Sequence, residues 1–361
     1  GLYYEKYSLL ENLTMKRLIT SRGCPYKCAY CFQPTYTALY KGTGSSKGFR
    51  RHSVGYVVEE IRRIQEKYPL KNIHFSDDIF NLDRKWIKEF SERYAAEIGL
   101  AFTCNIEITS IDENTVRALA EAGCTGVTFG LESGVEETRI NVLNKHIKDE
   151  RYVLITKLLH KYDIKVMTNV IICLPNETLD AAIKGLRFAL SLGTFAVRFS
   201  VLKLYKGTEL AKNALANDWC EGVGEYTCKA KDTHGDFDKI RQIYWFGSFA
   251  NKFPFLMAWA KPILSSRVTR LFRYLVLLNH WDDIRFFRFS LWHAWLFFWN
   301  SREQFIGGLA KGQKDTFVAE DGSTHDVGEL FAAPKAVVDW GGKGMDEDYR
   351  PVDDREPSRI A

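Results

Sequence analysis

The sequence of 361 residues contains no uninterrupted apolar run of 18 residues and no apolar segment of the kind found in secretory signals. Its eight cysteines also lack the paired, regular spacing of a secreted disulfide framework. These absences argue against membrane-spanning helices and against secretion, and they favour a reducing, cytoplasmic compartment. The chain begins at Gly1 rather than at Met, which indicates a fragment or a processed chain.

Hydrophobic residues make up 46% of the sequence, which is ordinary for a globular protein and sufficient for a sizeable core. A chain of this length accommodates one α/β domain of about 200 to 250 residues and an appendage. The net charge of +5 conceals two different regions. Residues 239–303 carry ten Lys or Arg against three Asp or Glu, whereas residues 311–361 carry seven against twelve.

Three of the eight cysteines lie within eight residues, in the stretch RGCPYKCAYC of residues 22–31. They are Cys24, Cys28 and Cys31. Gly23 and Pro25 favour a loop, and a loop can direct all three thiols toward one metal centre. Iron–sulfur cubanes are usually bound by four thiolates, so a C-x3-C-x2-C triplet without a fourth partner leaves one iron free for an exogenous ligand.

A zinc site or a set of buried cysteines is the alternative interpretation of this triplet. Structural zinc needs a fourth ligand at a conventional spacing. Cys104 and His52 are both distant in sequence, and no Cys or His follows the triplet closely. The triplet therefore favours an iron–sulfur cluster over zinc.

Strand and helix patterns alternate through the first two thirds of the chain. Candidate strands are 16–20, 72–75, 101–106, 126–131, 164–172 and 195–202, and helical patterns cover 84–97, 112–122, 149–161 and 178–191. A further helix begins after Ser53, which is a good capping residue. Six strands separated by helices predict a parallel sheet with right-handed crossovers. Periodicity alone does not distinguish a doubly wound open sheet from a barrel.

Polar residues follow three of the expected strands. Ser76-Asp77-Asp78 ends the second strand, Glu132-Ser133-Gly134 the fourth, and residues 174–178 the fifth. Asp78 or Asn176 alone could simply cap the following helix. Their joint placement at the strand ends predicts a functional site there.

The cysteine triplet, with Tyr30 between its last two members, resembles the signature of the radical S-adenosylmethionine (SAM) superfamily. The phrases FSDDIF, GLESG, ICLPNET and LYKGTEL resemble, in this order, the radical SAM core of enzymes associated with a cobalamin-binding domain, over roughly residues 16–212. This resemblance implies a partial (β/α)6 TIM-type barrel whose site lies at the carboxyl ends of the strands. It also implies a [4Fe-4S] cluster that binds SAM and cleaves it reductively to a 5′-deoxyadenosyl radical.

The resemblance further implies a role for individual residues. Cys24, Cys28 and Cys31 would bind the cluster, Asp77 would lie by the amino end of SAM, Glu132 by the ribose and Tyr30 by the adenine, with Pro175 and Asn169 closing the pocket. Two phrases depart from the usual pattern. Glycines are usual where this chain has Cys173 and Asn176, and prolines are usual where it has Leu204 and Lys206.

The other five cysteines have a different interpretation. Cys104, Cys124 and Cys173 lie in or beside expected strands, and free cysteine is commonly buried, so we expect core positions for them. Cys220 and Cys228 are eight residues apart in a polar segment. Two thiols are too few for a second cluster, and a catalytic role for them rests only on analogy within the superfamily.

Residues 213–306 are expected to form a helical, basic and aromatic extension. Residues 239–303 hold 18 aromatic residues interleaved with arginines such as Arg267, Arg270, Arg273 and Arg288. The apolar patch from Phe289 to Trp299 is too short to span a bilayer. A helical cap over the opening of the incomplete barrel is favoured over an interfacial helix pair on an anionic membrane. No RNA-binding motif accompanies these residues, so nucleic acid is not an expected partner.

The remaining segments complete the expected organisation. Residues 1–15 form a lead-in, 16–212 the radical SAM core barrel, and 307–361 a polar, partly disordered tail with a short hairpin around Asp321-Gly322. No cobalamin-ligand motif D-x-H-x2-G is present, because Phe237 occupies the glycine position after Asp232-Thr233-His234. If cobalamin is used, its domain is expected upstream of Gly1.

The sequence therefore predicts a radical SAM enzyme, a methyltransferase or an oxidoreductase, that performs methyl transfer, cyclisation or rearrangement. Its substrate would be a small molecule, a tetrapyrrole or a lipid-like compound. Its electron donor would be a flavodoxin or a ferredoxin, and it would be cytoplasmic, with peripheral membrane contact through residues 239–303 as one option. The alternative is a non-catalytic iron–sulfur or zinc-binding scaffold at a membrane.

Overall fold

The computed structural model describes residues 11–39, 49–223, 227–266, 282, 285–287, 316–318 and 324–326. The chain divides into two compact units, residues 1–294 and 295–361. In the second unit, β12 (Thr316–Val318) pairs antiparallel with β13 (Thr324–Asp326). This pairing confirms the hairpin expected around Asp321-Gly322.

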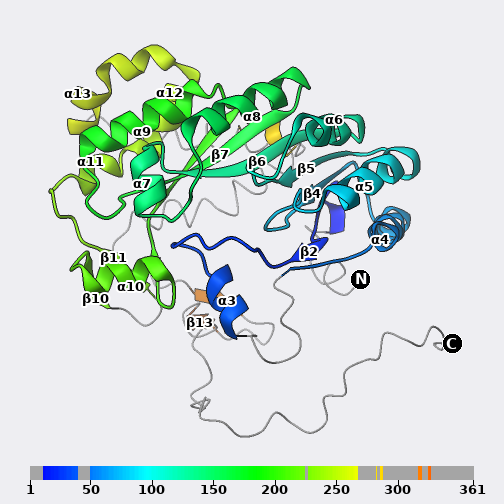
Figure 1. Ribbon diagram of the computed structural model, residues 1–361, viewed down its shortest axis with the longest axis horizontal. Helices are drawn as coiled ribbons and strands as arrows, with labels where there is room; N and C mark the ends of the chain where they lie inside the picture. The colour runs from blue at the N-terminus through cyan, green and yellow to red at the C-terminus, as the bar shows by residue number, and fades with distance from the viewer. Residues whose placement is uncertain are drawn as a thin grey trace, which may run out of the picture. The chain divides into compact units, whose positions relative to one another are not determined.

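A six-stranded sheet forms the centre of the first unit (Figure 1). Its strands, in spatial order, are β1 (Met15–Leu18), β4 (Asn72–Phe75), β5 (Ala101–Asn105), β6 (Cys124–Glu132), β7 (Lys165–Ile172) and β8 (Ala196–Val201). Every neighbouring pair is parallel. β1 and β8 lie at the two edges, so the sheet is a partial barrel and does not close within the described residues. The predicted six-stranded parallel architecture is confirmed.

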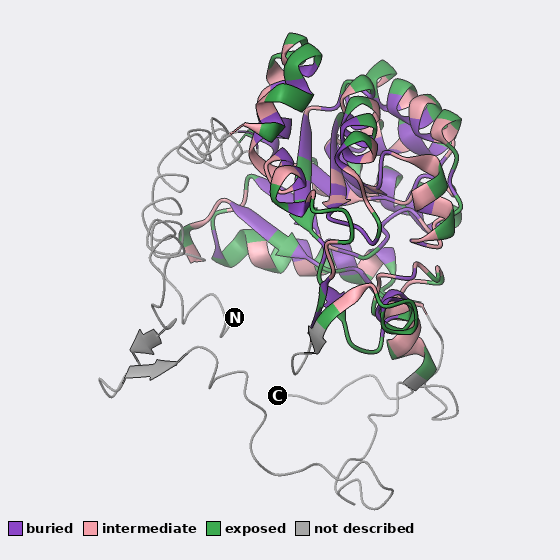
Figure 2. Ribbon diagram, turned by 90° about the vertical axis from the view of Figure 1, so that its left-hand side faces the viewer, coloured by how far each residue is buried: buried purple, intermediate pink, exposed green. Residues whose placement is uncertain are grey.

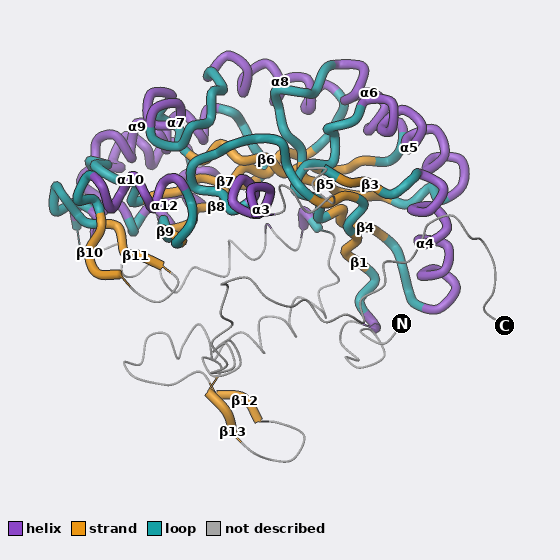
Figure 3. The backbone as a smooth tube through the Cα atoms, turned by 60° about the horizontal axis from the view of Figure 1, so that its bottom comes forward, coloured by secondary structure: helices purple, strands orange, loops and turns teal. Residues whose placement is uncertain are grey.

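Helices connect successive strands and form an outer layer around them (Figure 3). They are α4 (Val54–Lys67), α5 (Arg84–Glu97), α6 (Glu113–Glu121), α8 (Asp149–Lys161) and α9 (Leu179–Ser191). Four begin after a side chain that accepts a hydrogen bond from the first turn, namely Ser53, Asp83, Asp112 and Thr178. The capping residues therefore fix where these helices start.

Several short elements lack a readable sequence pattern because they span too few residues to show a period. They are β2 (Ser21–Arg22), β3 (Arg50–Arg51), α3 (Gln33–Leu39), α7 (Glu136–Asn141), β9 (Leu204–Tyr205), α10 (Glu209–Ala216), β10 (Cys220–Val223) and β11 (Thr227–Ala230). β2 pairs with β3, and β9, β10 and β11 form a small antiparallel sheet. The segment expected to be a helical extension thus contains a β-hairpin, formed by β10 and β11.

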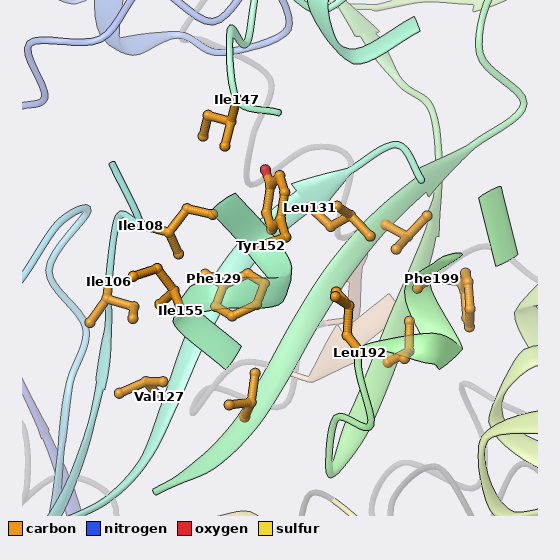
Figure 4. Packing of buried hydrophobic residues seen from close by; sticks show 14 of the residues in the cluster. Ile106, Ile108, Val127, Phe129, Leu131, Ile147, Tyr152, Ile155, Leu192 and Phe199 are labelled. Carbon is orange, nitrogen blue, oxygen red and sulfur yellow. The ribbon is translucent and has the colours of Figure 1, made fainter. Parts of the chain in front are cut away.

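The main core lies between the outer face of the sheet and the helices, where the strands are buried and the helices keep exposed outer faces (Figure 2). Phe129 of β6 packs against Tyr152 of α8 in this layer (Figure 4). The core also contains Cys104, Cys124 and Cys173, each at most 5% exposed. Their expected core positions are confirmed.

The inner face of the sheet is filled from its amino-terminal side by two rings of the extension. Phe286 and Phe287 are buried against Met15 of β1, Met167 of β7 and Ala196 of β8. The main-chain oxygen of Phe287 accepts a hydrogen bond of 2.6 Å from the Asn72 side chain. These rings therefore bridge the two edge strands of the open sheet.

The remaining described part of the extension packs beside β8. It consists of α11 (Phe237–Ile240), α12 (Ile243–Lys252), the 3-10 helix η1 (Pro254–Trp259) and α13 (Ala260–Ser265). A side-chain carbon at Gly247 of α12 would stand 2.3 Å from the Phe199 ring, so this glycine allows the helix to approach the strand. Arg267, Arg270, Arg273, Arg288 and the patch from Phe289 to Trp299 lie outside the described residues. None of the helices described is long and apolar enough to cross a membrane.

Candidate active site

The three clustered cysteines lie in one loop between β2 and α3, at the carboxyl end of the sheet. Gly23 opens this loop with a φ of 95°, and the Cys31 N–H donates to the Cys28 carbonyl over 3.1 Å. Ala29 is buried and fixed on both sides: its N–H donates to Leu143 O at 2.9 Å, and its carbonyl accepts from Leu210 N–H at 2.8 Å. Distant parts of the chain therefore hold the loop in place.

All three thiols of the loop are free and half-buried. Burial raises the pKa of Cys24 to about 11 and raises the pKa of Cys28 and of Cys31 as well. The ammonium of Lys145 acts in the opposite direction on the pKa of Cys28. Among the described residues, no three His, Cys, Asp or Glu side chains converge closely enough to hold a single metal ion.

The end of β6 places a carboxylate beside this loop. Glu132 follows an irregularity in the pairing with β7 and has a left-handed backbone, with a φ of 65°. Its side chain folds back over Gly130, where a side-chain carbon would stand 1.8 Å from the Glu132 Oε1 atom. Lys145 Nζ lies 3.7 Å from the same oxygen and donates to Gly130 O over 2.6 Å. Position 130 therefore requires glycine, because the Glu132 carboxylate and the Lys145 ammonium occupy the space that a side chain would fill.

Tyr30 completes this group of side chains. Burial raises its pKa strongly, and the nearby Glu132 carboxylate and Cys28 thiol raise it further. Cys28, Tyr30, Glu132 and Lys145 therefore share one half-buried cluster at the carboxyl ends of the strands, although they come from three separate parts of the chain. We refer to these four residues as the Glu132 cluster.

A buried arginine shapes the segment that carries Lys145. Arg139 is fully buried and donates to the carbonyls of Ser133 at 2.6 Å and Ile147 at 2.9 Å, and also to the carboxylate of Asp149. From the segment between these contacts, Asn144 donates through its side chain to Lys27 O over 2.9 Å. Arg139 thus stabilises a loop that holds both the cysteine loop and Lys145.

The two acidic residues after β4 fix the ends of the cysteine loop. Asp77 is fully buried, and its carboxylate accepts hydrogen bonds from the Thr20 N–H at 3.1 Å, from the Thr20 hydroxyl and from the Ser21 hydroxyl. Asp78 is exposed and accepts from the Gln33 side chain at 2.7 Å. Asp77 therefore lies beneath the start of the loop and outside the Glu132 cluster.

The remaining two residues expected in the site lie on β7 and after it. Asn169 pairs with Gly130 on one side and with Arg198 on the other, one strand away from Glu132. Pro175 is buried in the loop that follows β7. In the same loop Cys173 and Asn176 have φ values of 61° and 58°. The backbone thus keeps a conformation that favours glycine, even though this chain has other residues at the two positions.

Three comparisons with known proteins bear on the fold and the family. Residues 18–189 match the radical SAM superfamily. An uncharacterized methyltransferase of Pyrococcus horikoshii is 30% identical over 202 residues, covering 56% of this chain and 42% of the relative. The cytidylyl-2-hydroxyethylphosphonate methyltransferase of Streptomyces wedmorensis is 26% identical, covering 55% and 37%. The solved structure of the cobalamin-dependent SAM radical enzyme OxsB with aqua-cobalamin has a TM-score of 0.52 at 13% identity, covering 79% and 49%, which shows a shared fold.

Residues 18–189 are a radical SAM domain. The chain spans less than half the length of the two methyltransferases that it matches.

The donor atoms of this radical SAM domain suit the cofactors that the superfamily implies. Three free thiols in one loop form a donor set for iron, and the ammonium of Lys145 partly offsets the burial that raises the pKa of Cys28. A buried hydroxyl oxygen of Ser76, directly after β4, has no hydrogen-bond partner among the described residues. A hydrogen-bonding group at the same end of the sheet is therefore available to a ligand.

The sequence alone did not identify Lys145 as a site residue, nor the steric requirement for glycine at position 130. Alternation along a strand places residues i and i+2 on one face, so Gly130 and Glu132 in the phrase GLESG carried a readable signal for a small residue beside the carboxylate. Lys145 carried no such signal. Its position depends on the loop that Arg139 stabilises, and no spacing in the sequence reveals that loop.

Proposed function

We propose that this chain carries the catalytic domain of a radical SAM enzyme in which Cys24, Cys28 and Cys31 bind a [4Fe-4S] cluster. The observation that carries the proposal is the convergence of the cysteine loop with the Glu132 cluster at the carboxyl ends of the strands. When bound, the cluster would supply an electron to SAM, whose reductive cleavage starts radical chemistry.

The residues of the domain have different proposed tasks. Glu132, Tyr30, Asn169 and the backbone near Pro175 would bind and orient SAM. Lys145 would hold the Glu132 side chain in position, since the two side chains lie within ion-pair distance. Asp77 was expected at the amino end of SAM, but its oxygens already accept hydrogen bonds from Thr20 and Ser21. These contacts favour a positioning role for Asp77, in which it holds the start of the cysteine loop.

We propose methyl transfer to a small-molecule substrate as the reaction, because the two similar proteins from Pyrococcus horikoshii and Streptomyces wedmorensis are named as methyltransferases. Cyclisation and rearrangement are the other reactions that such a domain could start. A flavodoxin or a ferredoxin would donate the electron. Cobalamin is a further candidate cofactor, because the structure with a similar fold contains aqua-cobalamin.

The test is anaerobic reconstitution of the chain with iron and sulfide. We expect the absorption of a [4Fe-4S] cluster and an EPR signal that changes when SAM is added. Cys28→Ala should abolish both, because the two remaining thiolates cannot replace the lost bond. Cys104→Ala is the matched control, since this thiol is fully buried in the core, and it should retain both signals.

Three outcomes would contradict the proposal. Loss of the cluster in Cys104→Ala would indicate a site with four cysteine ligands and no open iron. Stoichiometric zinc with no response to SAM would indicate the non-catalytic scaffold. Formation of the cluster without any SAM cleavage, with a chemical reductant and with or without added cobalamin, would remove the proposed activity.

A further inference from the structure

The connection between α12 and α13 presents apolar side chains to solvent. Phe253, Phe255 and Trp259 are 46%, 71% and 64% exposed, and the first two rings lie 6.2 Å apart. Three apolar neighbours of these rings, Pro254, Ala258 and Pro262, are exposed as well. We propose that this surface, which we call the aromatic turn, docks on an anionic lipid bilayer. The inference does not depend on the proposed radical chemistry, because the aromatic turn shares no residue with the site.

The segment that carries the aromatic turn is anchored to the rest of the domain. The opposite side of the same segment is packed into the core through Met257, Ala260 and Leu264, each at most 7% exposed. Arg187 of α9 donates to the Met257 carbonyl over 3.0 Å. The exposed rings are therefore held outward by a segment whose other face is already buried.

Basic side chains surround the aromatic turn. Lys261 is 63% exposed and pairs with Asp180 of α9, and Lys252 pairs with Asp282. Arg187 and Lys184 are exposed on the neighbouring helix α9. Among these described side chains, four cations thus stand against two carboxylates. This balance of charge complements anionic headgroups.

The size and composition of the surface favour lipid over a protein partner. An aromatic side chain buries about 150–250 Å² when fully covered. Because these three side chains are only 46%, 71% and 64% exposed, together they offer roughly 270–450 Å². A stable protein–protein interface needs about 800 Å² from each partner. Tryptophan and phenylalanine with flanking basic residues are typical of segments that lie in the interfacial region of a bilayer.

The experiment measures flotation of the chain with vesicles of phosphatidylcholine mixed with phosphatidylglycerol, and with vesicles of phosphatidylcholine alone. We expect binding to the mixed vesicles that weakens as salt is raised. The double variant Phe255→Ser, Trp259→Ser should bind at least tenfold more weakly, with an unchanged melting temperature. Lys261→Gln should weaken binding about fivefold. Leu154→Ser, which alters a 50% exposed leucine on α8, is the matched control and should bind like the unaltered protein.

Absence of binding to either type of vesicle would overturn the proposal. So would an equal loss in Leu154→Ser, because binding would then reflect general stickiness. If sedimentation velocity showed that the double variant turns a dimer into a monomer while the unaltered protein ignores vesicles, the surface would pair two copies of this chain. A fall in the melting temperature of the double variant would mean that the rings pack against the protein itself.

Discussion

The two ends of the parallel sheet are built in different ways. At the amino-terminal side of the inner face, the rings of Phe286 and Phe287 fill the space between the edge strands. At the carboxyl end, Glu132, Cys173 and Asn176 have left-handed backbones, and polar side chains gather around the cysteine loop. Strain at non-glycine residues persists where the surrounding structure imposes it, and this often happens at functional sites. The comparison indicates that packing fills the first end, whereas the second end combines three left-handed residues with the polar side chains of the site.

The largest effect is expected when the packing at the amino-terminal side is removed. Phe286→Ala should lower the free energy of unfolding by about 3–5 kcal/mol, because Phe286 is 2% exposed and its loss leaves a cavity. Cluster formation at low temperature should persist, since the site lies at the other end of the strands. Urea unfolding and reconstitution with iron and sulfide measure the two effects.

Two further variants check the cause of this loss. Phe255→Ala alters a 71% exposed ring and should change the free energy of unfolding by less than about 0.5 kcal/mol. A side-chain carbon at Gly126 would stand 2.8 Å from the Phe286 ring, so Gly126→Ala should be destabilising. Combined with Phe286→Ala, it should cost less than the sum of the two changes. Strict additivity would show that Phe286 does not occupy this space.

The second prediction concerns the loss of folding stability in acid through His74, at the amino-terminal side of the sheet. Burial and the guanidinium groups of Arg17 and Arg198 lower the pKa of His74 from 6.5 to about 4. Because the unfolded chain takes up this proton more readily, stability should fall as pH drops from about 6.5 to 4, by at most about 3 kcal/mol. His74→Gln should make this part of the pH profile flatter. An unchanged profile would show that His74 titrates normally in the folded protein.

The third prediction concerns the carboxyl end of the sheet, where stability should change with pH in the opposite direction. Burial raises the pKa of Glu177 from 4.5 to about 7, while its carboxylate accepts from the Leu174 N–H at 3.0 Å. Stability should therefore fall as pH rises from about 4.5 to 7. Glu177→Gln keeps an acceptor oxygen without a charge, so it should raise the free energy of unfolding at pH 8 by about 1–3 kcal/mol and have little effect below pH 4.5. Equal effects at both pH values would remove the electrostatic explanation.

The main fold could be predicted because its signals are local. Short apolar runs separated by helical patterns marked the six strands, and the capping residue Ser53 marked the start of one helix. Spacing alone also grouped the three cysteines. The two-residue strands β2 and β3 could not be found in this way, because they exist only through their pairing with each other.

The detailed site could not be predicted, because it depends on contacts between distant residues. Asp77 and Glu132 look alike in sequence, since both are acidic residues at the ends of strands. The carboxylate of Asp77 accepts hydrogen bonds from Thr20, which is 57 residues away in sequence. The carboxylate of Glu132 instead lies beside Lys145 and Tyr30 in the site. Only the folded chain shows which carboxylate is already satisfied and which one is available to a ligand.

The smallest effect on stability is expected at Glu132 itself, where the two ends of the sheet can be compared directly. Glu132→Gly should relieve the left-handed backbone and raise the free energy of unfolding by about 0.5–1 kcal/mol, while SAM binding weakens. Glu132→Gln keeps the backbone and loses only the charge. It should weaken SAM binding by about 1–3 kcal/mol without any gain in stability.

Asp163→Gly is the matched control, because Asp163 has a φ of 55° at the opposite end of β7, between α8 and that strand. It should give a similar gain in stability and leave SAM binding unchanged. Calorimetric titration of the reconstituted protein with SAM, together with urea unfolding, measures both quantities. If Glu132→Gly lost stability while Asp163→Gly gained it, the backbone at Glu132 would be held by interactions of its side chain, and the strain would not be a cost of building the site.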